Sequence, residues 1–110
     1  MDNKIIYSAT FIKKAKIYKK KYPLLVEDLY QLEEKLLENP EQGNDLGAGL
    51  YKIRLAVKSK GKGKSGGFRV ITYLVSNLPD ETVINMLTIY DKSEESSIDK
   101  KELQKIIKGL

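Results

Sequence analysis

The spacing of apolar residues changes twice along this 110-residue chain, and that change limits the folds open to it. Over roughly the first forty residues, apolar side chains recur every three to four positions, as on the buried face of a helix. From residue 50 to residue 90 they alternate with polar residues or form short β-branched and aromatic runs, as in strands. Helical spacing returns over residues 98–108. Two helices, three consecutive strands and a last helix predict an α+β fold rather than alternating β-α-β units.

Two helices are expected before the strands. Ser8 or Thr10 can cap the first helix, which should run to about Lys21 because Pro23 follows. Its apolar stripe comprises Phe11, Ile12, Ala15 and Tyr18 or Lys19. The second helix should stop before Asn39-Pro40. Its leucines at helical spacing are Leu25, Leu29, Leu32, Leu36 and Leu37. The two segments predict a helical hairpin whose leucines face the core.

The strands should form a small antiparallel sheet on which the helical hairpin packs. We expect them at residues 50–57, 68–75 and 83–90, with a turn around Pro79. Residues 42–49, rich in glycine, are predicted to be a loop, and residues 4–7 would add an edge strand. The C-terminal helix carries Leu103, Ile106 and Ile107 on one face. The length predicts one domain over residues 1–110.

Histidine and cysteine are both absent from the chain. Their absence excludes disulfides, thiolate nucleophiles and cysteine metal sites, and it removes the commonest general acid or base. We therefore expect no metal site and no cofactor. There is no apolar run of membrane-spanning length, and the N-terminus lacks the apolar core of a signal peptide. The expectation is a cytoplasmic protein without a membrane partner.

Positive charge is concentrated in the middle of the sequence. The net charge is +5, but residues 46–79 hold seven cations and no acidic residue, so the rest of the chain carries −2. The only arginines of the chain, Arg54 and Arg69, both lie in this span. Arginine suits bidentate contact with phosphate. A solvated charged loop is the alternative, but the uniform sign favours a phosphate-rich partner.

Strand geometry predicts where part of this charge should converge. Lys52 and Arg54 are two residues apart, so both side chains leave the same face of a sheet, about 7 Å apart. On the next strand, Arg69, Ile71 and Tyr73 share one face. If the two faces coincide, three cations and a phenol lie together, and the phenol could stack on a base or donate a hydrogen bond.

A lysine–glycine segment joins these two strands. Residues 61–66 match G-x-G-x-x-G, but a strand rather than a helix follows, which excludes a dinucleotide site and equally a phosphate-binding P-loop. Glycine does allow the backbone to approach an anion closely. The candidate nucleic-acid-binding lysines here are Lys58, Lys60, Lys62 and Lys64.

Cleavage of RNA is feasible without histidine, because RNA supplies its own nucleophile, the 2′-hydroxyl beside each phosphate. The enzyme then needs a base, stabilisation of the charged phosphorane and an acid for the leaving oxygen. A lysine can act as the base only if its pKa falls well below about 10.4, and neighbouring cations shift it in that direction. Arginine stays charged and can only stabilise or position.

Four blocks in this order resemble the RelE/ParE superfamily of toxins from toxin–antitoxin systems. They are residues 51–55 (YKIRL), 60–67 (KGKGKSGG), 68–73 (FRVITY) and 87–94 (LTIYDKSE). The glycine–lysine insertion resembles the HigB-type branch, and the resemblance covers nearly the whole chain. It implies a toxin that cuts messenger RNA in the ribosomal A site. It also implies partners: the ribosome, mRNA and a cognate antitoxin of the helix-turn-helix type.

The resemblance also implies roles for individual residues. Lys52 would be base or stabiliser, Arg54 and Arg69 would stabilise the phosphorane, and Lys92 would add a cation. Two positions depart from the family pattern: Ser93 replaces a basic residue, and an RNA-stacking tyrosine would fall at about Asp99. Tyr73 or Tyr90 could replace that tyrosine, and the general acid stays unassigned.

Two other functions fit the same sequence. A ParE-like poison of DNA gyrase would share the fold and act on a different target, which fold alone does not exclude. A non-catalytic nucleic-acid-binding module would show steeply salt-dependent binding without cleavage.

Overall fold

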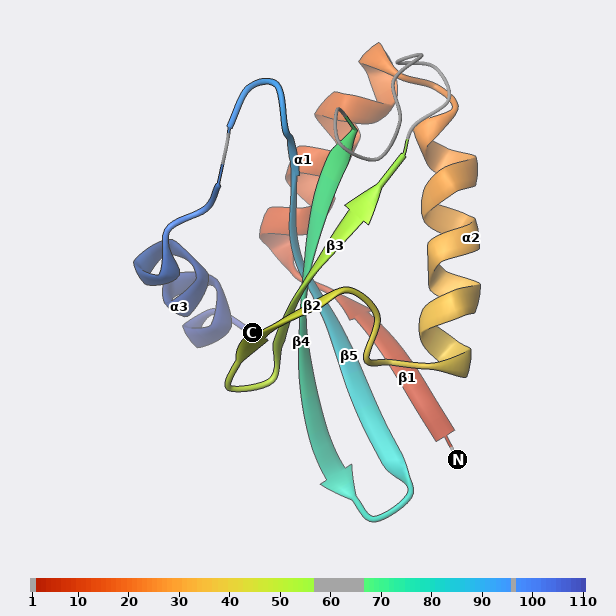
Figure 1. Ribbon diagram of the computed structural model, residues 1–110, viewed down its shortest axis with the longest axis vertical. Helices are drawn as coiled ribbons and strands as arrows, with labels where there is room; N and C mark the ends of the chain where they lie inside the picture. The colour runs from red at the N-terminus through yellow and green to blue at the C-terminus, as the bar shows by residue number, and fades with distance from the viewer. Residues whose placement is uncertain (1, 57–66, 96) are drawn as a thin grey trace.

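The computed structural model describes residues 2–56, 67–95 and 97–110, and this part of the chain forms an α+β fold (Figure 1). Its elements are, in order, β1 (Asp2–Tyr7), α1 (Ala9–Lys21), α2 (Leu25–Glu38), β2 (Asn44–Gly47), β3 (Leu50–Leu55), β4 (Phe68–Leu78), β5 (Glu81–Asp91) and α3 (Lys100–Lys108). The predicted fold class is confirmed. None of the helices in the described ranges is long and apolar enough to cross a membrane.

The helical hairpin follows its sequence signals closely. The Ser8 side chain accepts a hydrogen bond from the Phe11 N–H at 3.0 Å, so Ser8 is the N-cap of α1 rather than Thr10. Helix α1 ends at Lys21 and α2 ends before Asn39, as predicted. The leucine stripe of α2 is buried except for Leu37, which is 45 % exposed and was wrongly counted as core.

One edge strand of the sheet was predicted and the other was not: residues 4–7, expected as an edge strand, fall within β1. The strands lie in the order β1-β5-β4-β3-β2. Residues 44–47, predicted as loop, form β2 and pair with β3, while β1 pairs in parallel with β5. The sheet is therefore mixed rather than wholly antiparallel. Two helices and three strands separate β1 from β5 in sequence. Because no hairpin turn joins β1 to β5, the two strands are free to pair in parallel.

The other strands and the last helix differ from their predicted limits by a few residues. β4 and β5 are longer than expected and meet at a turn over Pro79 and Asp80. β3 ends at Leu55, and α3 starts at Lys100 because the Asp99 carboxylate caps it by accepting from the Lys101 N–H at 3.1 Å.

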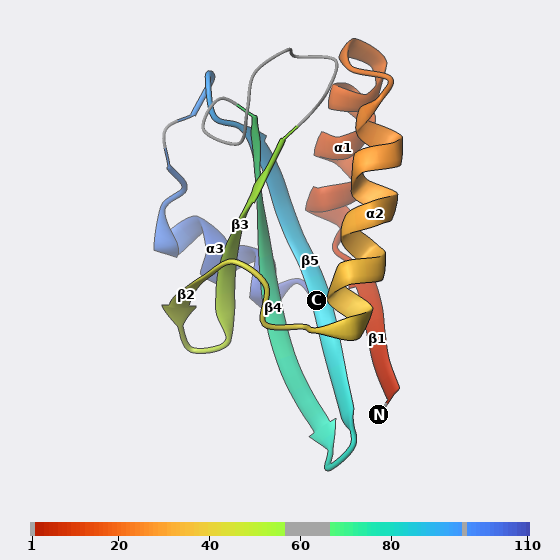
Figure 2. The same cartoon turned by 45° about the vertical axis from the view of Figure 1, so that its right-hand side comes forward.

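The sheet separates two apolar clusters (Figure 2). Helices α1 and α2 cover one face, where side chains such as Phe11, Leu32 and Val70 are buried. Helix α3 covers part of the other face, where Leu103 packs with Leu87 and Tyr90. Because α3 is short, it leaves the upper part of β3 and β4 on its side uncovered by helix (Figures 1 and 2). The candidate site lies in that region.

Candidate phosphate-binding site

The paired strands β3 and β4 bring three cations to one face of the sheet. Arg54 lies directly opposite Arg69, and Lys52 lies opposite Ile71. Directly paired residues share a face, as do residues two apart in a strand. Lys52, Arg54 and Arg69, which we name the cation cluster, therefore all lie on the α3 side of the sheet. The face of β3 that carries Lys52 and Arg54 is thus the same face of the sheet as the one that carries Arg69 on β4.

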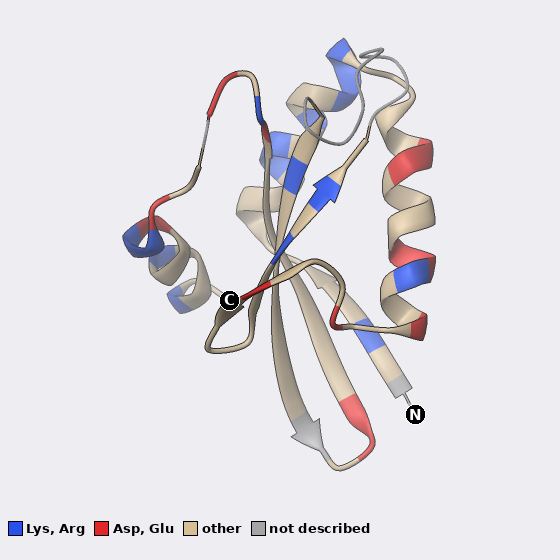
Figure 3. Cartoon of the chain, in the orientation of Figure 1, with Lys and Arg blue, Asp and Glu red and all other residues tan. Residues whose placement is uncertain are grey.

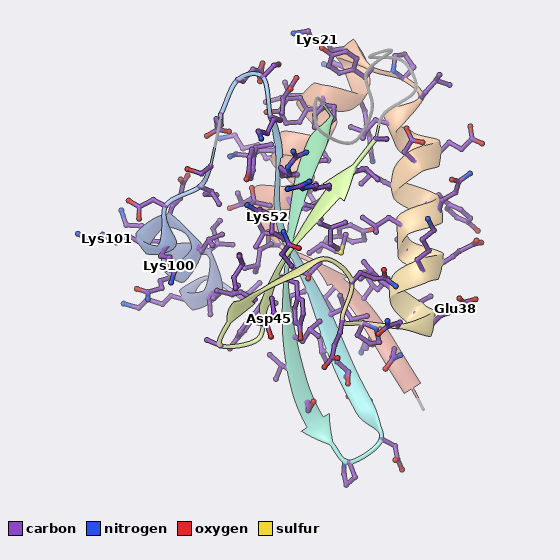
Figure 4. All side chains as sticks on the ribbon, viewed as in Figure 1. Lys21, Glu38, Asp45, Lys52, Lys100 and Lys101 are labelled. Atoms are coloured by element: carbon purple, nitrogen blue, oxygen red, sulfur yellow. The ribbon has the colours of Figure 1, made fainter. Side chains whose placement is uncertain are left out.

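The three cations differ in how firmly the fold holds them. Arg69 is only 3 % exposed, and its Nη1 donates to the Phe68 carbonyl oxygen at 3.2 Å. Lys52 is half-buried on the central part of β3, where Figure 4 labels it, and Arg54 is exposed. One guanidinium is thus fixed within the sheet while its neighbour can reach a ligand from solvent. This arrangement suits an anion that presents several oxygens.

The phenol nearest this cluster is Tyr90 rather than Tyr73. Tyr90 pairs directly with Arg69, whereas Tyr73 lies four residues from Arg69 along β4, about 13 Å, and packs in the α3 cluster, diagonally opposite Lys52. Burial raises the pKa of Tyr90, the Arg69 charge lowers it and the Glu95 charge raises it. The Tyr90 side chain is only 1 % exposed, so its ring offers no open face on which a base could stack.

Other predicted nucleic-acid contacts are placed only in part. Lys58, Lys60, Lys62 and Lys64 lie outside the described residues. Lys92 is exposed just after β5, and its N–H donates to the Gly67 carbonyl oxygen at 3.1 Å. Ser93 and Asp99, the two positions that depart from the family pattern, have structural roles. Ser93 donates to the buried Asp91 carboxylate through both its N–H and its hydroxyl, and Asp99 caps α3.

Sequence reasoning missed a link between α1 and the segment after β5. The Tyr18 hydroxyl donates to Glu94 Oε1 at 3.2 Å and accepts from the Asp91 N–H at 3.4 Å. Lys14 Nζ lies 4.0 Å from Glu95 Oε2 beside it. These contacts hold the segment that carries Lys92 close to the top of the sheet. Nothing in the local sequence signals them.

A groove opens between α2 and β3, on the face of the sheet opposite to the side chains of the cation cluster. Its volume is about 450 Å³, and Lys52 and Arg54 contribute to its lining. Helix α2 contributes Asp28 and Lys35, which sequence reasoning did not single out. A signal for Asp28 was available, because it stands three residues after Leu25 and four before Leu32, within the leucine stripe that faces the core.

The fold and this site define a class: a small basic α+β protein that presents clustered cations on a sheet. The family then follows from sequence comparison. A family model described as the RelE toxin of the RelE / RelB toxin–antitoxin system matches residues 3–109. The chain belongs to this family. It is accordingly a toxin of a toxin–antitoxin system, and membership implies a cognate antitoxin as its partner.

Proposed function

We propose that the protein is an endoribonuclease that cuts messenger RNA on the ribosome, with the cation cluster holding the phosphate at the cut. The observation that carries the proposal is the direct pairing of Arg54 with Arg69 on the face that also holds Lys52. Two guanidinium groups at paired positions of one sheet face can contact the same anion. Guanidinium groups bind phosphate oxygens in a bidentate manner, so a phosphate is the anion that fits best.

The reaction needs no cofactor. The 2′-oxygen of one nucleotide loses its proton and attacks the adjacent phosphorus, and the bond from phosphorus to the 5′-oxygen breaks. The products are a 2′,3′-cyclic phosphate and a 5′-hydroxyl end that has gained a proton. Lys52 serves as base or stabiliser, while Arg54 and Arg69 neutralise the charge that builds on the phosphorane oxygens.

The remaining assignments follow from the family and the charge pattern. Lys92 and the lysines of residues 58–64 would contact the RNA backbone, where each neutralised phosphate adds affinity without sequence preference. The glycine–lysine insertion at residues 60–67 supports a HigB-like branch, and with it an antitoxin of the helix-turn-helix type. A ribosomal target places the activity in the cytoplasm.

Replacing Arg54 tests the proposal with least risk to the fold, because this side chain is exposed. Expression of the wild type should halt translation and create new 5′ ends inside translated codons. Arg54→Ala should lower the cleavage rate by about 100-fold, the usual cost of losing one transition-state donor. Lys101→Ala, which removes an exposed cation from α3, is the matched control and should cleave normally.

Two results would reject the assignment. Full cleavage by Arg54→Ala, Lys52→Ala and Arg69→Ala would show that the cation cluster is not the site. DNA breaks and an SOS response with intact messages would identify gyrase as the target instead.

A further inference from the structure

The outer edge of β3 is only partly paired in the part of the chain that the structure describes. Strand β2 pairs with Leu50, Tyr51 and Lys52, and no described strand continues this pairing along residues 53–55. On its inner side, β3 pairs with β4 over its whole length. A strand edge with free N–H and C=O groups can accept a further strand from a partner.

The hydrogen-bond pattern identifies the backbone groups that face this open edge. The Leu74 N–H donates to the carbonyl oxygen of Gly49, just before β3, at 2.9 Å. Because hydrogen bonding alternates along an antiparallel strand, the odd-numbered residues of β3 bond toward β4 and the even-numbered residues face away from it. Lys52 accordingly meets Asn44 of β2. The N–H and C=O of Arg54 face the same side, beyond the last residue that β2 pairs with.

The groove between α2 and β3 runs beside this edge and contains a buried carboxylate. Residues 52–56 line the groove, whose volume is about 450 Å³, together with Asp28 from the first turn of α2. The Asp28 side chain is only 8 % exposed, and its Oδ2 has no hydrogen-bond partner among the residues that the structure describes. A buried acceptor without a donor costs stability, and a carboxylate only accepts hydrogen bonds. Lys35 also lines the groove, but it is exposed and lies two helical turns away, about 10 Å. The position of Asp28 therefore suits a basic side chain supplied by a partner.

The geometry of a sheet determines how a strand added to this edge would present its side chains. Its residue opposite Arg54 would lie on the face that holds the cation cluster, where an acidic side chain would pair with the exposed guanidinium. The residues before and after it would point to the other face. Ile53 and Leu55 pack on that face, where the groove opens, so a basic side chain there is directed toward Asp28. The fitting segment alternates basic, acidic and basic residues.

We propose that an extended segment of the cognate antitoxin adds a strand to β3 at Arg54, with an acidic side chain against Arg54 and a basic one against Asp28. Family membership supplies this partner, so the binding itself does not rest on the proposed endoribonuclease function. One consequence does rest on it: the acidic side chain would occupy the guanidinium that is to hold the substrate phosphate.

Amide exchange measured by NMR tests for the added strand. In the free protein the Arg54 amide should exchange quickly, whereas the Ile53 and Leu55 amides, which bond toward β4, should exchange slowly. In the complex with the full-length antitoxin, exchange at Arg54 should slow by about tenfold or more. Unchanged exchange at Arg54 in the complex would overturn the inference. Protection that appears in the free protein as its concentration rises would instead identify a second copy of the chain as the occupant.

Two synthetic peptides test the side-chain pattern. Acetyl-TVRERVT-amide places its glutamate against Arg54 and its arginines toward the groove. Acetyl-TRVEVRT-amide has the same composition and net charge, but it moves both arginines to the face of the cation cluster. In NMR titrations the first peptide should bind about tenfold more tightly, because only it offers a partner to Asp28. Equal binding of the two peptides to the wild type would reject the proposed pattern, and this comparison needs no variant.

Variants separate the two contacts of the proposed strand. Asp28→Asn should remove the preference for the first peptide, whereas Glu27→Gln, which removes the same charge at an exposed position outside the groove, should keep it. Arg54→Pro and Arg54→Ala both lack the guanidinium, but only proline also lacks the N–H. Proline is compatible with this position because that N–H faces away from β4. Antitoxin affinity should be about tenfold lower for Arg54→Pro than for Arg54→Ala, and equal affinities would contradict strand addition. No measurement here includes cleavage, so failure of the proposed function would leave the result intact.

Discussion

Tyr18 shows how a single hydroxyl group can connect two distant parts of the fold. It links α1 to the segment after β5 through the Asp91 N–H and the Glu94 carboxylate, 73 and 76 residues away in sequence. Burial is the largest cause that raises the pKa of Tyr18, to about 12. The Glu94 charge raises it further, and the hydrogen bond from the Asp91 N–H lowers it. The folded state therefore favours the protonated phenol.

This raised pKa predicts a loss of stability at alkaline pH. Below about pH 10 the phenol is protonated in both the folded and the unfolded chain, so its full contribution is present. Between about pH 10 and 12 only the unfolded chain releases the proton, and stability falls. Urea unfolding from pH 8 to 12 should show a steeper decline for the wild type than for Tyr18→Phe. Tyr30→Phe, at a 64 % exposed position, should follow the wild type. Parallel pH curves for the wild type and Tyr18→Phe would contradict the prediction.

The site residues were accessible from sequence only where a local pattern determines their position. Lys52 and Arg54 share a face because alternation within a strand requires it. That Arg69 pairs with Arg54 depends on the register between β3 and β4, which nothing in either strand alone specifies. Asp28 was overlooked for another reason: its place within a leucine stripe was visible, but its missing hydrogen-bond partner is a property of the packed structure.

At the scale of elements, β2 shows what local propensity fails to predict. This short strand follows Gly43 and ends at Gly47, both at positive φ, and its register with β3 shifts between Asp45 and Gly47. Glycine-rich segments predict loops, because glycine weakens a strand. The strand exists because the edge of β3 offers pairing, including Asn44 opposite Lys52. The same tertiary pairing adds β1 to the sheet in parallel with β5.

Gly43 and Gly47 allow the close packing of β2 on β3 to be tested. A Cβ at Gly43 would lie 2.9 Å from Ile53 Cγ1 and would clash with the Lys52 carbonyl oxygen, whereas a Cβ at Gly47 would meet nothing within 4 Å. Their φ values are nearly equal, +91° and +89°. Gly47→Ala should therefore show only the backbone cost, about 1–2 kcal/mol. Gly43→Ala should be clearly less stable than Gly47→Ala in urea unfolding, and equal stability of the two variants would show that β2 does not press on β3.

At the scale of the whole molecule, the fold keeps the charge asymmetry of the sequence. The strands β3 and β4 carry cations on adjacent positions, and lysines also mark α1 and α3, while acidic residues lie mainly on α2, around β2 and in the segment after β5 (Figure 3). Positive charge therefore covers β3, β4, α1 and α3, while α2 and the segment after β5 are more acidic. Such a distribution attracts a polyanion in one orientation, which net charge alone would not do.

The salt dependence of RNA binding measures where this attraction acts. Each phosphate neutralised on a single strand contributes about −0.7 to the slope of log K against log salt. A variant with Lys58, Lys60, Lys62 and Lys64 changed to Gln should therefore lose up to about 3 units of that slope. A matched variant removes the same charge from exposed positions of α3, by changing Lys100, Lys101, Lys105 and Lys108 to Gln. This variant should lose less than about 1 unit of the slope. The measurement is fluorescence anisotropy of a labelled single-stranded RNA between 50 and 200 mM salt.

If both variants lose the same slope, binding follows net charge and the lysine–glycine segment has no special part in it. If only the first variant loses slope, the lysines of residues 58–64 contact the RNA backbone and the charge on α3 does not.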